Sequence, residues 1–103
     1  MATSEASPLP VQTVPSVIRL PERLTVDQAA DILQSFKSAS TASVIVEFDD
    51  VINVDTAGLQ LLLMVRQWLG ERGSSCEWRA VPELVIEEAR MLGLAKRLEL
   101  DSA

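Results

Sequence analysis

The sequence contains no histidine and only one cysteine, Cys76, among its 103 residues. Without histidine, and without a serine or cysteine beside a candidate base, it lacks the usual groups for nucleophilic hydrolysis. One cysteine cannot form an internal disulfide or a thiolate metal cluster, which fits a reducing compartment and predicts a cytoplasmic protein. These absences argue against a hydrolytic enzyme and against a thiolate metal site.

Basic residues are also scarce, since 9 Lys and Arg face 15 Asp and Glu, for a net charge of −6. Binding to a phosphate backbone needs clustered basic side chains, so we expect no nucleic-acid partner. The most apolar stretch, residues 59–69, is interrupted by Gln60, Arg66 and Gln67. A membrane span needs roughly 20 apolar residues, so we expect none. The N-terminus, "MATSEASPLPVQT", has no basic segment followed by an apolar one, so it predicts no secretory signal.

The length and composition predict one folded domain. A chain of 103 residues is of ordinary single-domain size, and 48% hydrophobic against 23% charged residues is typical of a globular protein. Residues 1–13 are rich in Ser, Thr and Pro and show no periodicity. We therefore predict a flexible tail over residues 1–13 and a single domain over residues 14–103.

Stretches of β-forming residues alternate with helical patterns along this domain. Strands are predicted over residues 14–20, 44–48 and 75–80. Helices are predicted from residue 25, over residues 57–72 and from residue 82. The order β-α-β-α-β-α implies a sheet that is at least partly parallel. The predicted fold class is α/β, with helices packed on a small mixed β-sheet.

Local signals refine three of these elements. Thr25 and Gln28 have the spacing of a capping box, in which each side chain satisfies the other's free backbone N–H. Residues 44–48 are apolar at almost every position, which predicts a central strand covered on both faces. Gly73 and Gly93 follow helical patterns and are predicted to end them.

The stretch "NVDTAGL", residues 53–59, joins a predicted strand to the second predicted helix. Asp55 and Thr56 are both good N-cap residues, because a side-chain oxygen accepts free N–H groups at a helix start. The helix N-terminus also favours negative charge, so the fold would tolerate a phosphate on Thr56. We expect Gly58 to leave the first turn open to close approach by a partner backbone.

The second predicted helix has two faces at about 100° per residue. One face is predicted to be core and contains Gly58, Leu61, Leu62, Val65, Trp68 and Leu69. The opposite side, together with Thr56, contains Leu59, Gln60, Leu63 and Gln67. Two leucines on a polar side indicate either an exposed partner surface or packing against a neighbouring helix.

The segment from Val44 to Leu94 resembles the STAS domain, the family that includes bacterial anti-sigma factor antagonists. The family's hallmark is a strand ending in Asp-Ser/Thr-x-Gly-Leu before the second helix, and residues 55–59, "DTAGL", match it at every position. The resemblance extends from about residue 14 to residue 100 and includes Gly73 and the later "MLGL".

This resemblance implies a non-catalytic signalling module without a cofactor or metal. In antagonists of the family, the kinase activity of a partner anti-sigma factor phosphorylates the hydroxyl residue, and only the unmodified form binds that partner. Thr56 occupies this position. The predicted partner-binding residues are Asp55, Thr56, Ala57, Gly58, Leu59, Gln60 and Leu63.

A second reading follows from the threonine itself. Threonine in this motif is also similar to the small STAS subunits that bind the ATPase of bacterial lipid-trafficking ABC transporters, and similar short proteins accompany chemotaxis systems. Thr56 would then be a contact in a constitutive adaptor for an ATPase or a chemotaxis-type signalling assembly.

An enzyme-like alternative gathers Asp49, Asp50 and Asp55 around Mg²⁺. Acids near strand ends are more often caps or solvated turns.

Overall fold

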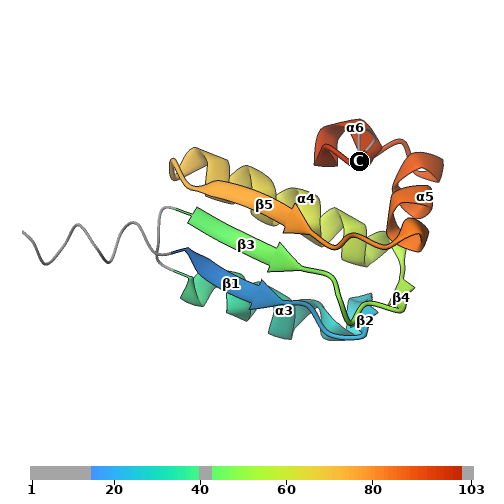
Figure 1. Cartoon of the computed structure of the whole chain (residues 1–103), viewed down its shortest axis with the longest axis horizontal. Coiled ribbons are helices and arrows are strands. Elements are labelled where there is room, and N and C mark those ends of the chain that lie inside the picture. The colour runs from blue at the N-terminus through green and yellow to red at the C-terminus, as the bar shows by residue number, and fades with distance from the viewer. Residues whose placement is uncertain (1–14, 40–42, 101–103) are drawn as a thin grey trace, which may run out of the picture.

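A three-stranded parallel sheet in the order β1-β3-β5 forms the centre of the fold (Figure 1). The structure is a computed structural model that describes residues 15–39 and 43–100. Its main strands are β1 (Ser16–Arg19), β3 (Ser43–Glu47) and β5 (Ser75–Arg79). The predicted α/β class and the central place of the second predicted strand are confirmed, and every described strand pair is parallel. The predicted tail and the start of the predicted first strand lie outside the described residues.

The two long helices lie on the same side of this sheet (Figure 1). They are α3 (Ala29–Ser38) and α4 (Thr56–Glu71), which also contact each other. Each connects neighbouring parallel strands, and the strand order advances in one direction from β1 to β5. Right-handed crossovers then place both helices on one face.

Burial of β3 follows from this one-sided cover. Val44 and Val46 are buried, whereas Ile45 is only half-buried. Successive side chains of a strand point to opposite faces, so Ile45 lies on the face away from the helices. The prediction that this strand is covered on both faces is therefore wrong for the part of the chain that the structure describes.

Two very short strands, β2 (Arg23–Leu24) and β4 (Asn53–Val54), form a second parallel pair. Their sequences predict no strand, because two residues are too few to show strand periodicity. Arg23 pairs with Asn53 and Leu24 with Val54. The pair brings the chain that enters α3 beside the chain that enters α4.

The entry to α3 also differs from the predicted capping box. A 3-10 turn, η1 (Val26–Gln28), precedes the α-helix, and the Thr25 side chain makes no capping hydrogen bond. The Thr25 hydroxyl donates to the carboxylate of Asp27 instead. The prediction of a Thr25–Gln28 box is therefore wrong.

Two shorter helices, α5 (Glu83–Met91) and α6 (Ala95–Leu98), complete the described chain. Gly73 and Gly93 have φ of 80° and 74° after α4 and α5, which confirms both predicted helix ends. The indole N–H of Trp78 donates to the Leu98 carbonyl at 2.7 Å and ties α6 to β5. Across the described ranges, no helix combines the length and apolarity that a membrane crossing requires.

Candidate functional site

Asp55 is the N-cap of α4. It has extended backbone angles, and its Oδ1 accepts a hydrogen bond from the Gly58 N–H at 2.8 Å. The sequence left Asp55 and Thr56 as alternative caps, and the geometry selects Asp55. Thr56 is then the first residue of the helix, and its side chain is exposed.

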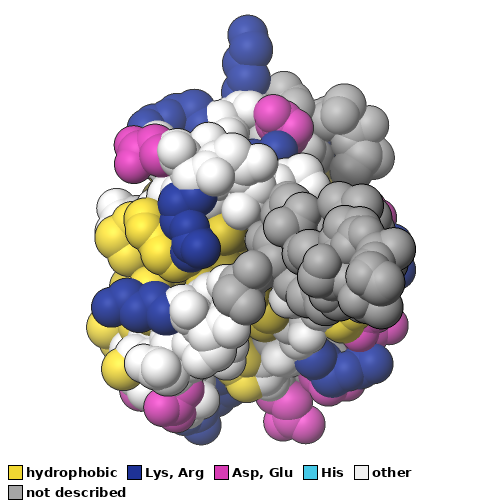
Figure 2. Space-filling view, turned by 90° about the vertical axis from the view of Figure 1, so that its left-hand side faces the viewer, with side chains coloured by type: hydrophobic (Ala, Val, Ile, Leu, Met, Phe, Trp, Pro, Cys, Tyr) yellow, Lys and Arg dark blue, Asp and Glu magenta, His cyan; other side chains and the backbone are white. Residues whose placement is uncertain are grey.

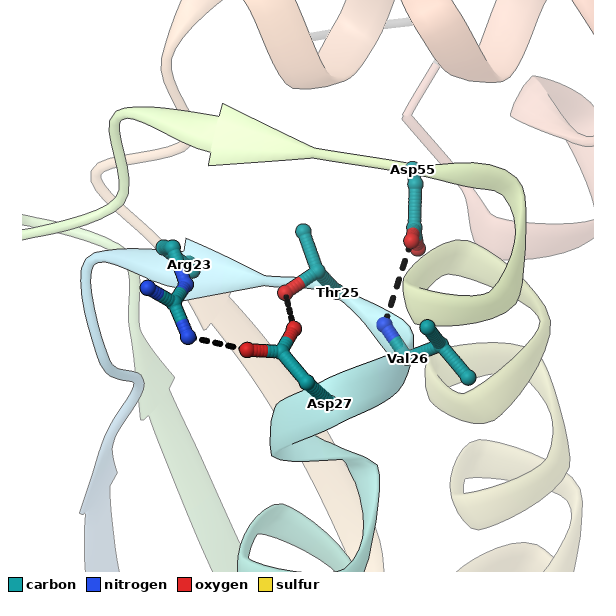
Figure 3. Close-up of polar contacts among 5 residues, drawn as sticks. All are labelled: Arg23, Thr25, Val26, Asp27 and Asp55. Carbon is teal, nitrogen blue, oxygen red and sulfur yellow. Dashed lines mark hydrogen bonds and ion pairs between the residues drawn. The ribbon is translucent and has the colours of Figure 1, made fainter.

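The second carboxylate oxygen of Asp55 accepts a hydrogen bond at the start of another helix. Asp55 Oδ2 accepts from the Val26 N–H, the first residue of η1, at 3.1 Å (Figure 3). One side chain therefore satisfies free N–H groups at the entries of both α3 and α4. This link depends on the pairing of β2 with β4, so no local pattern in the sequence indicates it.

Position 58 requires glycine because another part of the chain's own backbone lies very close to it. A Cβ at this position would lie 2.0 Å from the carbonyl oxygen of Leu24, far inside van der Waals contact. The same oxygen accepts from the Asp55 N–H at 3.2 Å. The expectation that Gly58 leaves room for a partner backbone is wrong, because the chain preceding α3 occupies that space.

The surface around Thr56 is smaller than predicted. Leu59 has 0% exposure and shares the hydrophobic core with Val85 and Leu98 of the C-terminal helices, so its assignment to an exposed partner surface is wrong. Leu63 is half-buried and packs against the same core. For both leucines, the packing alternative describes the structure.

Two of the remaining predicted residues are exposed and polar, and the other three are partly or fully buried. Thr56 and Gln60 are exposed, Asp55 and Ala57 are half-buried, and Gly58 is buried. Their role in binding a partner stays a prediction. Gln67, on the same side of α4, is exposed as expected.

A polar cluster missed by the sequence analysis lies next to Asp55 (Figure 3). The Asp27 carboxylate accepts from the Thr25 hydroxyl and forms an ion pair with Arg23. The hydrogen bond from Thr25 lowers the pKa of the Asp27 carboxyl, and the Arg23 charge acts in the same direction. The spacing of Arg23 and Asp27, four residues apart, could have indicated this cluster. The same spacing is also common in solvated helix starts, so it does not identify a site.

The geometry gives no support to a magnesium site. Asp50 pairs with Arg19 at 3.5 Å, and both Asp55 oxygens accept from backbone N–H groups. Within residues 15–39 and 43–100, no group of three or more His, Cys, Asp or Glu side chains is arranged to hold a metal ion.

Comparison with known families agrees with this architecture. The family model described as "Mlab, STAS domain" matches residues 9–100. No curated protein matches the chain.

A solved structure shows the same fold. It is described as a sulfate transporter family protein from Wolinella succinogenes, with a TM-score of 0.71 and 13% sequence identity. The match covers 82% of this chain and 70% of that one. At this identity, the likeness concerns the fold alone.

Proposed function

We propose that this chain, which belongs to the STAS domain family, is a cytoplasmic signalling module that binds a protein partner through the surface around Thr56. Domains of this family are generally non-catalytic regulatory or protein-interaction modules. The proposal adds that phosphorylation of Thr56 lowers affinity for the partner. That partner is an anti-sigma factor with serine/threonine kinase-like activity.

The exposed place of Thr56 on a fixed helix start carries the proposal. Asp55 and Gly58 set the backbone of this turn through a 2.8 Å hydrogen bond and a close approach to Leu24. Thr56 is therefore exposed on a backbone that is already ordered before a partner binds. Because binding need not order this backbone, the entropic cost of association is limited.

A phosphate on Thr56 would change this surface without breaking the fold. It adds a charge of roughly −1.5 to −2 at neutral pH, and a helix N-terminus favours negative charge. The half-buried Asp55 carboxylate beside it adds negative charge to the same small area. A partner surface that fits the bare hydroxyl would then meet repulsion and a desolvation cost.

The second candidate function is a constitutive adaptor for a transporter ATPase or a chemotaxis-type assembly. Threonine at the hydroxyl position favours it, because the adaptor-type STAS subunits that this motif resembles have threonine there. In this function Thr56 is a contact and is not modified. The two functions predict different effects of substitutions at one residue.

The test begins with a partner recovered from the source cell with the tagged wild-type chain. Its affinity is then measured for wild type, Thr56→Ala and Thr56→Glu. Ser35→Glu is the matched control, because Ser35 is an exposed hydroxyl residue on α3 and places the same charge elsewhere. The control variant should bind as wild type does.

The pattern of affinities separates the functions. Loss of binding in Thr56→Glu alone supports the phosphate switch, and phosphothreonine should then be detected by mass spectrometry after incubation with the partner and ATP. An equal loss of binding in Thr56→Ala and Thr56→Glu supports a contact role for Thr56. Equal binding by all three chains would remove Thr56 from the interface and refute both functions.

A further inference from the structure

A hydrophobic hollow lies between α3 and α4, away from the Thr56 surface. Its volume is about 240 Å³, and its lining residues are Leu33, Lys37, Met64, Val65 and Trp68. Trp68 lies 12 residues after Thr56, which is roughly 18 Å along the helix at 1.5 Å per residue. Met64 is 49% exposed, so the lining includes an apolar side chain that is open to solvent.

The rim of this hollow is basic although the whole chain has a net charge of −6. Lys37 belongs to the lining, and the Arg72 guanidinium stacks 4.6 Å from the centre of the Trp68 ring. Figure 2, which faces this end of the molecule, shows Lys and Arg side chains over and beside hydrophobic ones. The hollow is thus suited to an apolar group accompanied by negative charge.

Its size favours apolar side chains of a protein over a small ligand. Ligand pockets usually enclose roughly 300–1,000 Å³, and this hollow is smaller and open to solvent. Aromatic residues, Met and Arg are enriched where protein surfaces meet, and Met adapts its shape to the group it contacts. A helix that offers apolar residues at i, i+3 or i+4, and i+7 would fit such a groove.

Helix α5 of this chain has apolar residues at i and i+7 on its outward side, with an acid at i+3 between them. Val85, Ile86 and Ala89 face the core and are buried. On the opposite side, Leu84 is 38% exposed and Met91 is 80% exposed, and Glu87 is exposed between them. A purely solvated helix face does not need two apolar residues at i and i+7 around an acid, so this stripe is a complementary partner for the basic-rimmed groove.

We propose that the groove between α3 and α4 of one molecule binds the outward side of α5 of a second copy. Leu84 and Met91 of the second copy pack against Met64 and Trp68, and its Glu87 lies near Lys37. The acidic Glu87 then faces the basic Lys37. Met64 and Met91, which are exposed in the single molecule, become buried in the contact. No unknown partner is needed, because both halves of the interface belong to this sequence.

The arrangement is head to tail. The C-terminal ends of α3 and α4 lie at one end of the molecule and α5 at the other, so a chain does not fill its own groove (Figure 1). Such heterologous contacts give rings or open chains of molecules. One helix face in a short groove buries less than a standard interface of roughly 1,600 Å², so the association is weak and has a Kd of about 100 µM.

Two single substitutions test the contact from its two sides. Met64→Glu damages the groove and leaves α5 intact, whereas Met91→Glu damages α5 and leaves the groove intact. Both side chains are exposed, so both variants should fold, as circular dichroism and urea unfolding can verify. Ile52→Glu is the matched control, because Ile52 is 69% exposed and belongs to neither surface.

Sedimentation velocity over roughly 10 µM to 1 mM is the measurement. Wild type and Ile52→Glu should form larger species as the concentration rises, and each methionine variant alone should stay monomeric. An equal mixture of the two methionine variants should form one-to-one pairs and nothing larger, because it contains one intact groove for each intact α5. Lys37→Glu should weaken self-association at least tenfold, and adding Glu87→Lys to it should restore most of the loss.

Several results would overturn the proposal. A wild-type chain that stays monomeric up to 1 mM would do so. Self-association of either methionine variant alone, or a mixture with no pairs, would show that the interface is not formed by the groove and α5. Binding of the groove to an acidic helix of another protein, with wild type monomeric, would assign the groove to that partner instead.

Discussion

The backbone N–H of Val26 donates a hydrogen bond to the carboxylate of Asp55, 29 residues later in the chain, at 3.1 Å. The other oxygen of this carboxylate accepts from Gly58 at 2.8 Å. The starts of α3 and α4 are therefore held by one side chain, directly beside Thr56. The backbone that presents the candidate phosphorylation site is fixed by contacts from both helices.

Removing this carboxylate should destabilise the protein clearly. Loss of an N-cap costs about 0.5–2 kcal/mol, and Asp55→Ala also removes the bond to Val26, so we expect about 2 kcal/mol lost. Asp55→Asn keeps one acceptor oxygen and should lose about half of that. Urea unfolding followed by circular dichroism measures both values.

Asp50→Ala is the control for that measurement. Asp50 is also an acid on the loop that follows β3, and its carboxylate forms an exposed ion pair with Arg19 at 3.5 Å. An exposed ion pair contributes about 0.2–1 kcal/mol, so this change should matter little. Equal effects of Asp50→Ala and Asp55→Ala would show that Asp55 has no special structural role.

Two glycines of α4 should respond to alanine with opposite signs. Gly58→Ala places a Cβ 2.0 Å from the Leu24 carbonyl oxygen, where backbone must move, so we expect a loss of about 2–3 kcal/mol. Gly70 belongs to the same helix, and among the described residues no atom beyond its chain neighbours and the nearby helix backbone lies within 4 Å of an added Cβ. Gly70→Ala should stabilise the protein by about 0.5–1 kcal/mol through helix propensity. Denaturant midpoints that shift in the same direction for both variants would contradict this explanation.

The sequence predicted those elements that depend on near neighbours in the chain. Strand and helix patterns, the end of α4 at Gly73 and a cap at either Asp55 or Thr56 are set by sterics and hydrogen bonds within a few residues, and the structure has the cap at Asp55. The crossover rule then converted the order of elements into a parallel sheet. The strand predicted over residues 75–80 was found for the same reason, and in β5 Cys76 and Trp78 are half-buried whereas Ser75, Glu77 and Arg79 are exposed.

The errors concern residues whose surroundings come from distant parts of the chain. A helical projection of α4 contains no information on Val85 or Leu98, so it could not decide that Leu59 belongs to the same core as these two residues. The double cap by Asp55 required the two-residue pairing of β2 and β4, which leaves no periodic signal. Thr25 had a good capping-box partner in sequence, but the Gln28 N–H donates to the Thr25 carbonyl at 2.9 Å, and the Thr25 hydroxyl donates to the Asp27 carboxylate.

Cys76 should be a poorly reactive thiol at neutral pH. Burial raises its pKa above the ordinary 9.0, while the Arg66 charge acts in the opposite direction and is the smaller cause. Because only the thiolate is nucleophilic, alkylation by iodoacetamide should be slow in the native protein and faster in urea. Equal rates in both conditions would contradict the burial of this thiol.

The same raised pKa links stability to pH. The thiol of the unfolded chain ionises at a lower pH than the thiol of the folded chain. Below the pKa of the unfolded state, the neutral thiol therefore contributes its full stability. This contribution declines as the pH rises towards the pKa of the folded state. Wild type should therefore lose stability above about pH 9 relative to Cys76→Ala, which has no thiol to titrate. Urea unfolding of both chains at pH 7 and pH 10 measures the difference, and parallel pH curves would refute the link.

A strained residue at the end of β5 gives the final prediction. Ala80 has φ of 60°, in the left-handed region where an L-residue is disfavoured by roughly 1–2 kcal/mol. Ala80→Gly removes this strain but adds freedom to the unfolded chain, so we expect a net stabilisation of about 0.5–1 kcal/mol. Ala30→Gly, at an exposed site within α3, should instead destabilise by about 0.5–1 kcal/mol, because its backbone is helical. Thermal unfolding of the two variants beside wild type tests the prediction, and a lower midpoint for Ala80→Gly would mean that a glycine gains nothing from the positive φ at this residue.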